Sequence, residues 1–445
     1  MRLDKLIKTK KAKVAVIGLG YVGLPTAVEI AKAGYKVFGI DIQKVRVNKI
    51  NKGSSFLFDV SSKELKEAIK SKRLKAYNNH SVLRKADIVL ICVPTPLDKN
   101  KIPDISYIRS TAQEIAKHLK KGQLIILESS TYPGTTREVI LPELEKPIRR
   151  AQGKRLKVGR DFYLAFSPER IDPGNKIYKL KDVSRVVGGI TRKCTKLATE
   201  FYRTFISGQV MPLSSAEAAE MTKILENTFR LVNISMINEL ALLCGKMGID
   251  IWEVIEAAKT KPYGFMPFYP SPKLGGHCIP LDPFYLSYKA KEYNFWTRFI
   301  ELAGEINEQM PHAVVTKAIW ALNLRNKPVR GSKILVWGAA YKKDVGDPRE
   351  SAVYDIISDL LRKGAVVNYF DPYIPKLRLK DGFLKKSVTL KSVKYTPNIL
   401  KNYDLVLILT DHSGFNYDEL ARKSNFVVDT RNAIKSRKYK NVSWL

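Results

Sequence analysis

The chain has 445 residues, with 77 lysines and arginines against 43 aspartates and glutamates, so its formal net charge is +34. A content of 45% hydrophobic and 27% charged residues is typical of a globular protein and excludes a disordered chain. The length predicts two or three domains. Only four cysteines are present, which excludes a disulfide-stapled secreted scaffold. We therefore expect a reducing, cytoplasmic location.

The longest uncharged stretch begins at Val14 and ends before Glu29, and its glycines and Pro25 argue against a membrane span. Lysines precede this stretch as in a secretory signal, but a strand that enters a glycine turn explains the region better. The basic residues are scattered, without a basic motif interleaved with aromatic residues. Most of the charge is therefore expected to be solvated surface, with neither nucleic acid nor a membrane as partner.

The first part of the chain alternates apolar strands with helical segments. Strands are predicted over 13–17, 36–40, 86–93 and 123–128, and a helix over 26–33 that stops at a glycine. Continuous apolar strands separated by helices indicate a parallel sheet that is covered on both faces.

The middle of the chain, about 210–318, is predicted to be helical. Apolar residues recur at close to the helical period from Ser215 to Met247. A helix this long connects two units and buries a face either against a second subunit or inside a domain core, and the pattern favours neither.

A second α/β unit begins near residue 320 and echoes the first. Its predicted strands cover 333–337, 366–370, 404–409 and 425–428, with a helix over 351–363. This unit lacks Gly-x-Gly-x-x-Gly, so it either binds a nucleotide differently or only packs. The predicted fold class is α/β, with two Rossmann-like doubly wound domains joined by a central helical domain that contains a long helix.

A dinucleotide site is predicted at the first glycine turn. Gly18, Gly20 and Gly23 follow a strand and open a helix, and Asp41 ends the next strand. Glycines permit the tight turn and let backbone N–H groups approach a pyrophosphate at the helix N-terminus. Asp41 would accept hydrogen bonds from ribose hydroxyls and repel a 2′-phosphate, which favours NAD over NADP. The alternative is a glycine turn needed only for packing.

Lys223 and Asn227 lie four residues apart, on one face of the predicted long helix. A cation and an amide that point the same way stabilise an alkoxide or oxyanion. Taken alone the pair is a weak signal, because most such pairs face water.

A cysteine, Cys278, follows Gly275-Gly276-His277 in a glycine loop. A thiol needs a positive neighbour to become an effective nucleophile, and either His277 or Lys223 is a candidate. The other cysteines, Cys92, Cys194 and Cys244, lie in apolar contexts and are interpreted as structural thiols. A dinucleotide site combined with a reactive thiol points to hydride transfer through a covalent thiohemiacetal.

Eight segments occur in the order found in one enzyme family. They are VAVIGLGYVGLP (14–25), CVPTP (92–96), ESSTYPGTT (128–136), FSPERIDPGN (166–175), EMTKILEN (220–227), GFMPFYPSPKLGGHCIPLDPFYL (264–286), TRFIELAGEIN (297–307) and YKKDVGDPRES (341–351). Through them the chain resembles the nucleotide-sugar 6-dehydrogenases over nearly its whole length. The tyrosine-proline form of 131–134 and the GFMPFYP stretch look most like the UDP-N-acetylglucosamine 6-dehydrogenases.

The resemblance implies three domains, the central one for dimerisation, and we expect a homodimer and no metal ion. The domains would be an NAD-binding Rossmann domain over 1–209, a helical dimerisation domain over 210–318 and a Rossmann-like UDP-sugar domain over 319–445. The cofactor contacts implied by the resemblance and the glycine motif are Gly18, Gly20, Tyr21, Val22, Gly23, Asp41, Thr95 and Thr131.

The resemblance also implies catalytic roles. Cys278 would attack the C6 aldehyde, and Lys223 and Asn227 would stabilise the oxyanion. Asp282 and Thr131 would order a water for proton transfer and thioester hydrolysis. Glu169 would belong to the same water network or act as the general base. The implied substrate contacts are Glu169, Arg170, Lys223, Asn227, Phe265, Tyr269, Gly275, Arg298, Lys342 and Arg431, with Arg298 reaching the neighbouring subunit's site.

Two departures separate the chain from the UDP-glucose branch of the family. Pro173 replaces a second acid that the branch has four residues after the counterpart of Glu169, and Leu281 replaces a lysine. The expected reaction is the four-electron oxidation of the C6 hydroxyl of a UDP-N-acetylhexosamine, best UDP-N-acetylglucosamine, for surface polysaccharide precursors. The alternatives are UDP-N-acetylmannosamine or UDP-glucose as substrate and, more distantly, a two-electron β-hydroxyacid dehydrogenase or a nucleic-acid-binding protein.

Overall fold

The computed structural model describes residues 2–57, 60–98, 100–146, 155–170, 177–276, 278–379 and 387–445. Pro173 and His277 lie outside the described residues. The chain forms two compact units. Unit 1 comprises Met1–Glu226 with Phe284–Trp296, and unit 2 comprises Asn227–Pro283 with Thr297–Leu445. The predicted boundaries of three domains are not tested by this division and stay a prediction.

Unit 1 is built on an eight-stranded sheet of order β3-β2-β1-β4-β5-β6-β7-β8. Neighbouring strands run parallel except β6 and β7. The strands are β1 (Lys13–Ile17), β2 (Lys36–Ile40), β3 (Leu74–Tyr77), β4 (Ile88–Ile91), β5 (Leu124–Leu127), β6 (Tyr163–Phe166), β7 (Arg185–Gly189) and β8 (Val210–Pro212). The order of the first six is that of a doubly wound dinucleotide-binding sheet.

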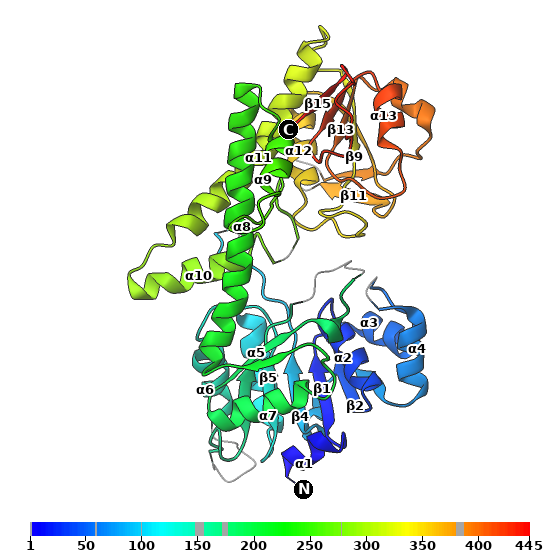
Figure 1. Cartoon of the computed structure of the whole chain (residues 1–445). Coiled ribbons are helices and arrows are strands. Elements are labelled where there is room, and N and C mark those ends of the chain that lie inside the picture. Colours follow the sequence, from blue (N-terminus) through cyan, green and yellow to red (C-terminus); the bar gives the residue numbers. More distant parts are fainter. Residues whose placement is uncertain are drawn as a thin grey trace. The chain divides into compact units, whose positions relative to one another are not determined.

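Both faces of this sheet are covered, because its strands are apolar on both sides (Figure 1). Val14 and Val16 pack with α1, α2, α3, α4 and α7, whereas Ala15 and Ile17 pack with α5 and α6. These helices are α1 (Leu3–Lys8), α2 (Gly23–Lys32), α3 (Lys44–Asn51), α4 (Ser62–Lys70), α5 (Ser106–His118), α6 (Leu141–Leu144) and α7 (Arg192–Tyr202). The predicted parallel sheet with two covered faces is confirmed.

The basic N-terminal run belongs to this fold. Leu3 and Ile7 of α1 are buried in the core of unit 1, while the lysines of the helix lie outside it. The hydroxyl of Tyr35 donates to the carbonyl oxygen of Ile7 at 3.0 Å. Leu3–Lys8 is therefore an amphipathic helix within unit 1, a role that the charge of this segment alone does not indicate.

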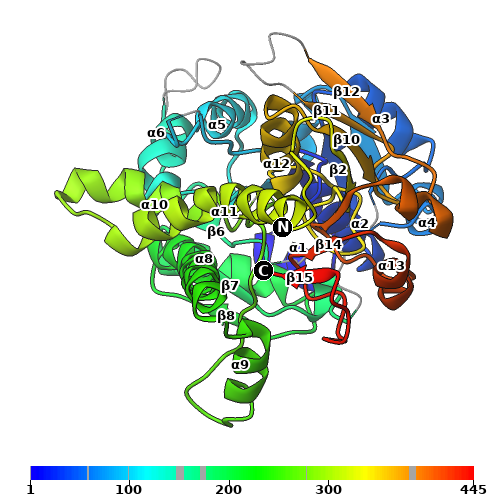
Figure 2. The same cartoon turned by 90° about the horizontal axis from the view of Figure 1, so that it is seen from above.

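Unit 2 contains a parallel five-stranded sheet of order β10-β9-β13-β14-β15 and a small antiparallel pair. The strands are β9 (Lys333–Trp337), β10 (Val366–Phe370), β11 (Lys376–Leu379), β12 (Val388–Lys391), β13 (Leu405–Ile408), β14 (Val427–Asp429) and β15 (Val442–Trp444). Helices α11 (Arg298–Asn323) and α12 (Ala352–Arg362) lie side by side and share its core (Figure 2). The predicted second α/β unit is therefore present.

The helix predicted over 215–247 is observed as α8 (Ala216–Met247), one continuous helix of 32 residues (green in Figure 1). It begins in unit 1 and continues into unit 2. The remaining α-helices are α9 (Ile251–Ala258), α10 (Asp282–Ala290) and α13 (Tyr417–Lys423). Every helix in the described ranges is too short or too polar to traverse a lipid bilayer.

Candidate active site

The glycine turn between β1 and α2 has the geometry of a phosphate-binding loop. Gly18 has φ +89°, and a Cβ there would lie 2.4 Å from the carbonyl oxygen of Cys92. A Cβ at Gly23 would lie 1.8 Å from the carbonyl oxygen of Gly18, whereas one at Gly20 would meet nothing within 4 Å. Gly18 and Gly23 are thus required by packing, and Gly20 leaves open space for a pyrophosphate.

The start of α2 is available to an anion. Its N-cap residue, Val22, makes no side-chain capping hydrogen bond. The first-turn N–H groups of a helix have no partners within the helix and favour negative charge. Tyr21 is exposed in the same turn. The residues of this turn therefore fit the pyrophosphate of a dinucleotide.

Asp41 follows β2 and is only 5% exposed. Its Oδ2 accepts hydrogen bonds from the backbone N–H of Leu19 at 3.0 Å and from Arg46 at 2.7 Å, and its Oδ1 accepts from Gln43 N at 2.9 Å. These contacts fix the carboxylate next to the glycine turn, where a ribose would be bound. They also place the guanidinium of Arg46 beside the ribose-binding acid, a neighbour that the motif did not reveal.

Three of the predicted catalytic residues lie buried in unit 1: Thr131, Glu169 and Lys223. Thr131 and Glu169 follow β5 and β6, so they lie at the carboxyl edge of the sheet, where open α/β folds bind ligands. Lys223 extends from α8 and donates from Nζ to the carbonyl oxygen of Glu169 at 2.7 Å. The structure therefore brings Lys223 and Glu169 together.

Two more predicted residues of unit 1 are held by protein partners. Arg170 pairs with Glu226 of α8, and its Nη1 donates to the carbonyl oxygen of Ser184 at 2.9 Å. The carbonyl oxygen of Thr95 accepts a hydrogen bond from the hydroxyl of Tyr285 in α10. Both contacts fix the loops that follow β6 and β4.

The other three predicted catalytic residues, Asn227, Cys278 and Asp282, lie in unit 2. Asn227 and Asp282 are buried, and Asn227 Nδ2 donates to Asp282 Oδ2 at 2.6 Å. Cys278 is exposed, and its carbonyl oxygen accepts from the backbone N–H of Asp282 at 2.8 Å. The thiol therefore lies in the turn that leads into α10, one helical turn before the paired carboxylate.

The glycine loop before Cys278 owes its glycines to packing within unit 2. A Cβ at Gly275 would lie 2.6 Å from the Cβ of Tyr341 and 2.8 Å from the carbonyl oxygen of Glu350. Gly276 has φ +84° and its N–H donates to the carbonyl oxygen of Arg349 at 3.1 Å. The segment 341–350 thus packs directly against the backbone of these two glycines, and a larger residue at either position would collide with it.

The remaining predicted substrate residues of unit 2 are solvent-accessible. Phe265 and Tyr269 are 37% and 38% exposed, and the Tyr269 hydroxyl donates to Glu256 at 2.9 Å. Lys342 is half-buried and Arg298 is exposed at the start of α11. Arg431 Nε donates to Asp411 at 3.3 Å.

Unit 2 uses its counterpart of Asp41 differently. Asp371 follows β10, and its Oδ2 accepts from Ala339 N at 2.6 Å, Ala340 N at 3.0 Å and the ring of His412 at 2.9 Å. His412 Nδ1 accepts from Asp344 N at 3.0 Å, so the hydrogen resides on Nε2 and points at Asp371. Burial raises the pKa of Asp371, but His412 and the backbone N–H groups of Ala339 and Tyr373 together hold this pKa below its usual value. A buried histidine is thus hydrogen-bonded to the acid that corresponds to Asp41.

Family models and known relatives agree with this geometry. The NAD-binding, central and UDP-binding domain models of the UDP-glucose/GDP-mannose dehydrogenase family match residues 12–206, 217–309 and 335–436. The chain belongs to this family. It is therefore an NAD-dependent UDP-sugar 6-dehydrogenase, and both the resemblance and the NAD expectation are confirmed.

Three relatives illustrate the range of similarity to this dehydrogenase. UDP-N-acetyl-D-glucosamine 6-dehydrogenase of Pseudomonas aeruginosa is 38% identical, covering 82% of this chain and 84% of the relative. UDP-N-acetyl-D-mannosamine dehydrogenase of Methanococcus vannielii is 33% identical, covering 99% and 98%. The structure of UDP-D-ManNAc dehydrogenase from Pyrococcus horikoshii matches with a TM-score of 0.85 at 32% identity, covering 97% and 98%.

Sequence reasoning missed a buried acid of this dehydrogenase, Glu220 on α8, one turn before Lys223. Its Oε2 accepts from Gly134 N at 2.6 Å, and its Oε1 accepts from Thr136 N at 2.8 Å and Thr136 Oγ1 at 2.7 Å. Glu220 is fully buried, and burial raises its pKa to about 7. Glu220 lies in the EMTKILEN segment, and this was the only sign in the sequence that it belongs to the site. No local pattern reveals the loop to which it binds.

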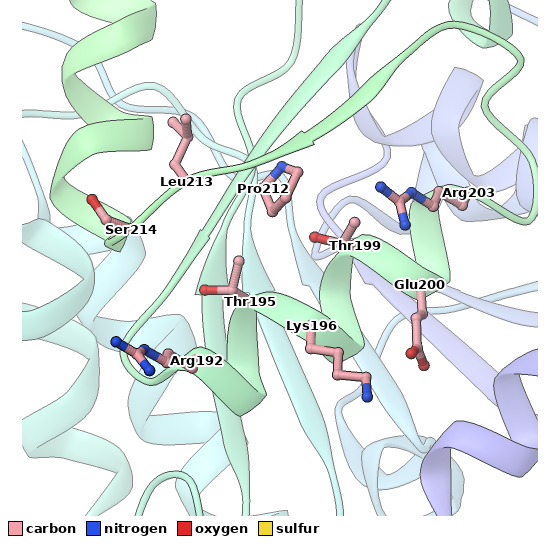
Figure 3. Close-up of a pocket in the computed structure, with 9 residues that line it drawn as sticks. All are labelled: Arg192, Thr195, Lys196, Thr199, Glu200, Arg203, Pro212, Leu213 and Ser214. Atoms are coloured by element: carbon pink, nitrogen blue, oxygen red, sulfur yellow. The ribbon is translucent and has the colours of Figure 1, made fainter.

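A hollow of about 470 Å³ lies elsewhere on unit 1 of this dehydrogenase (Figure 3). It contains none of the predicted catalytic or binding residues. Its lining residues, from α7 and the segment after it, are Arg192, Thr195, Lys196, Thr199, Glu200, Arg203, Pro212, Leu213 and Ser214. In the part of the chain that the structure describes, no group of three or more His, Cys, Asp or Glu residues could hold a metal ion.

Replacing Asp41 by alanine is expected to weaken NAD and to improve the use of NADP. The loss of hydrogen bonds to a charged acceptor costs about 1.5–3 kcal/mol, which corresponds to roughly a 10–100-fold lower kcat/KM for NAD. The released Arg46 can then meet a 2′-phosphate. Steady-state kinetics with both cofactors measure the change. In the matched double variant Asp41→Ala/Arg46→Ala the NADP gain should disappear, and an unchanged NAD-to-NADP ratio would contradict the assignment.

The raised pKa of Glu220 predicts a pH-dependent stability. Between pH about 4.5 and 7 the folded protein binds this proton more tightly than the unfolded chain, so the free energy of unfolding falls as pH rises. The whole effect is on the order of 3 kcal/mol. Denaturant unfolding of the wild type and Glu220→Gln at pH 5 and pH 8 measures it, because the variant should lack this decline.

Glu217, one turn earlier on α8, supplies the control for that experiment. Burial raises its pKa, but the hydrogen bond and charge of Arg137, together with hydrogen bonds from its own backbone N–H and from Ser215, leave the pKa below its usual value. Its contribution to stability therefore has the opposite sign and is lost as pH falls. Equal pH profiles for wild type and Glu220→Gln would show that Glu220 does not titrate in this range.

Proposed function

We propose that this dehydrogenase oxidises the C6 hydroxyl of a UDP-N-acetylhexosamine to the uronic acid, with UDP-N-acetylglucosamine as the preferred substrate and two NAD used per sugar. The product would supply surface polysaccharide synthesis. The observation that carries the proposal is the exposed thiol of Cys278 one helical turn before the Asn227–Asp282 pair. A plain two-electron β-hydroxyacid dehydrogenase has no use for such a thiol.

The identity of the sugar is supported by the relatives and by one residue. The relative with 38% identity is named for UDP-N-acetyl-D-glucosamine, and that with 33% for UDP-N-acetyl-D-mannosamine. Leu281 stands where the UDP-glucose branch has a lysine. UDP-N-acetylmannosamine is therefore the second candidate, and UDP-glucose the third.

The first half of the proposed mechanism forms a covalent intermediate on Cys278. NAD would be held by the glycine turn and Asp41 and would accept a hydride from C6 in each of the two oxidations. The first oxidation, in which the hydroxyl also loses its proton to water, gives the C6 aldehyde. The thiolate adds to the C6 aldehyde, so that a C–S bond forms and the carbonyl oxygen becomes an oxyanion. The ammonium of Lys223 and the amide of Asn227 stabilise that oxygen. Oxidation of this thiohemiacetal gives a thioester.

The second half releases the product. A water molecule ordered by Asp282 and Thr131 attacks the thioester carbonyl carbon, and Glu169 belongs to its hydrogen-bond network or takes the proton. The C–S bond breaks, Cys278 leaves as a thiolate, and the sugar leaves as a carboxylate. Phe265, Tyr269, Gly275, Lys342 and Arg431 are proposed to contact the UDP-sugar, together with Arg170.

The three-domain organisation is part of the proposal. The family-model matches at 12–206, 217–309 and 335–436 fall inside the proposed domains 1–209, 210–318 and 319–445, which supports these boundaries. The cytoplasmic location is supported by the four cysteines, all of which are thiols in the structure.

We expect Cys278→Ser to abolish net uronate formation, with kcat lower by about a thousandfold or more, while NAD binding is retained. Uronate is quantified by mass spectrometry, NADH by absorbance and NAD binding by calorimetry. Cys244→Ser, at a half-buried thiol of α8, is the matched control and should stay active. Normal turnover of the Cys278→Ser variant would exclude the covalent route.

Assays of the wild type with three UDP-sugars test the substrate. We expect the highest kcat/KM with UDP-N-acetylglucosamine, followed by UDP-N-acetylmannosamine and then UDP-glucose, and two NADH per sugar. One NADH per sugar would favour the two-electron alternative. A preference for UDP-glucose would contradict the inference from Leu281.

A homodimer is proposed from α8. Within unit 2 its exposed apolar side chains are spaced by seven, four, three and four residues, which is the a/d spacing of a helix that packs on a second helix. They are Phe229, Met236, Leu240, Leu243 and Met247. The proposed occupant is a second copy of the chain, and the exposed Arg298 would reach the site of that copy.

Leu240→Glu combined with Leu243→Glu should convert the proposed dimer to a monomer, because two charges cannot be buried at that seam without partners. Analytical ultracentrifugation measures the mass. Arg230→Glu, an exposed position of α8 outside the seam, should leave the dimer intact. A monomeric wild type, or a dimeric double variant, would contradict the proposal.

A further inference from the structure

The turn after β5 contains two buried threonine hydroxyls in contact. Thr131 Oγ1 lies 2.6 Å from Thr135 Oγ1, and Thr135 Oγ1 donates to the carbonyl oxygen of Tyr132 at 2.8 Å. Thr131 is 1% exposed and Thr135 is fully buried. Thr131 is the residue proposed above to order water, whereas Thr135 has no role in that mechanism.

The direction of the hydrogen bond between the two hydroxyls follows from a count of hydrogens. Each hydroxyl has one hydrogen and two lone pairs. Thr135 has a second acceptor for its hydrogen, the Tyr132 carbonyl, whereas the described residues offer Thr131 only Thr135 Oγ1. Both hydrogens are used when Thr131 donates to Thr135 and Thr135 donates to Tyr132. Thr131 then presents lone pairs, and therefore an acceptor, to the remaining space around it.

Glu220 holds the backbone on both sides of Thr135. One carboxylate oxygen accepts from Gly134 N at 2.6 Å, and the other accepts from Thr136 N at 2.8 Å. A single buried side chain of α8 thus fixes residues 134 and 136, and the residue between them has little freedom to move. The backbone that carries the Thr135 hydroxyl is held by this pair of contacts.

We infer that Thr135 and Glu220 are positioning residues for Thr131. Thr135 takes the hydroxyl hydrogen of Thr131, so that Thr131 Oγ1 faces the site as a hydrogen-bond acceptor, and Glu220 holds Thr135 in place. The inference rests on the proposed role of Thr131 in ordering the hydrolytic water. An acceptor at Thr131 orients that water with one hydrogen toward Oγ1 and leaves an oxygen lone pair for the thioester carbon.

A double-mutant cycle separates positioning from a general structural effect. Thr131→Val should lower kcat by about 10-fold or more, with little change in KM for either substrate. Thr135→Val should lower kcat by about 5–10-fold, the equivalent of one hydrogen bond. In the Thr131→Val background Thr135→Val should have no further effect on kcat, because no hydroxyl remains to be positioned. Thr135→Ser keeps the hydroxyl and should restore kcat.

Thr199→Val is the matched control, since it removes another buried threonine hydroxyl of unit 1. Thr199 is 4% exposed, and its Oγ1 has no hydrogen-bond partner among the described residues. This variant should leave kcat unchanged. Glu220→Gln tests the second part of the inference, because it loses the acceptor for one of the two backbone N–H groups. It should lower kcat severalfold when Thr131 is present and not in the Thr131→Val background.

The outcomes separate failure of the inference from failure of the proposed function. If Thr131→Val has normal kcat, the proposed role of Thr131 is wrong. If Thr131→Val is impaired but Thr135→Val is not, the inference is wrong and the proposed function stands. Equal losses from Thr135→Val in both backgrounds would mean a structural role for Thr135, which also overturns the inference. If Thr135→Val fails to fold, the effect of Glu220→Gln on kcat is compared with and without Thr131→Val. Equal losses in both backgrounds would again overturn the inference.

Discussion

The buried carboxylate of Glu128 links the ends of three adjacent strands of unit 1. Glu128 follows β5. Its Oε2 accepts a hydrogen bond at 3.5 Å from the thiol of Cys92, which follows β4, and its Oε1 accepts one at 3.3 Å from Arg185. Arg185 also donates to the carbonyl oxygen of Pro168, after β6, at 3.3 Å. A buried charge is tolerated only when it is paired and hydrogen-bonded, so this network specifies one arrangement of the three loops. Thr95, Thr131 and Glu169 all depend on those loops.

The two α/β units show how one fold serves two purposes. In unit 1 the acid after the second strand, Asp41, accepts two backbone N–H groups and one arginine, and the neighbouring Gly20 leaves room for a ligand. In unit 2 the corresponding acid, Asp371, is occupied by His412 and by several backbone N–H groups. The second unit thus lacks the glycine fingerprint and also differs from the first in the partners of this acid. The sequence analysis predicted that the second unit either binds a nucleotide differently or only packs. The contact between Asp371 and His412 gives this prediction a physical basis.

The sequence predicted the parts of the fold that depend on local pattern. The strands over 13–17, 36–40, 333–337 and 366–370 have the observed bounds, since continuous apolar runs between glycine and charged residues leave little choice. The run predicted over 86–93 is a strand only from Ile88 to Ile91, because its ends bend into loops. The contacts of Glu128 and Glu220 were not predicted, since pairing of buried polar residues far apart in the chain has no local periodicity. The residues of the candidate site were predicted from family motifs, whereas the hydrogen bonds and ion pairs that hold these residues in place were seen only in the structure.

Side chains in the first turns of α8 bind two of these loops and hold them in place. Glu220, Lys223 and Glu226 recur every three residues, so they occupy neighbouring positions along the helix surface. Glu220 binds the backbone after β5, Lys223 binds the carbonyl oxygen of Glu169 after β6, and Glu226 pairs with Arg170 in the same loop. A helix is rigid over the fewer than two turns that separate these residues, so contacts at these positions fix the two loops relative to each other. The spacing of acids and a lysine within EMTKILEN therefore has a structural reason besides chemistry. The helix that carries the proposed oxyanion-stabilising ammonium also binds the backbone of Gly134, Thr136 and Glu169, in the two loops that contain the residues proposed to act on the water.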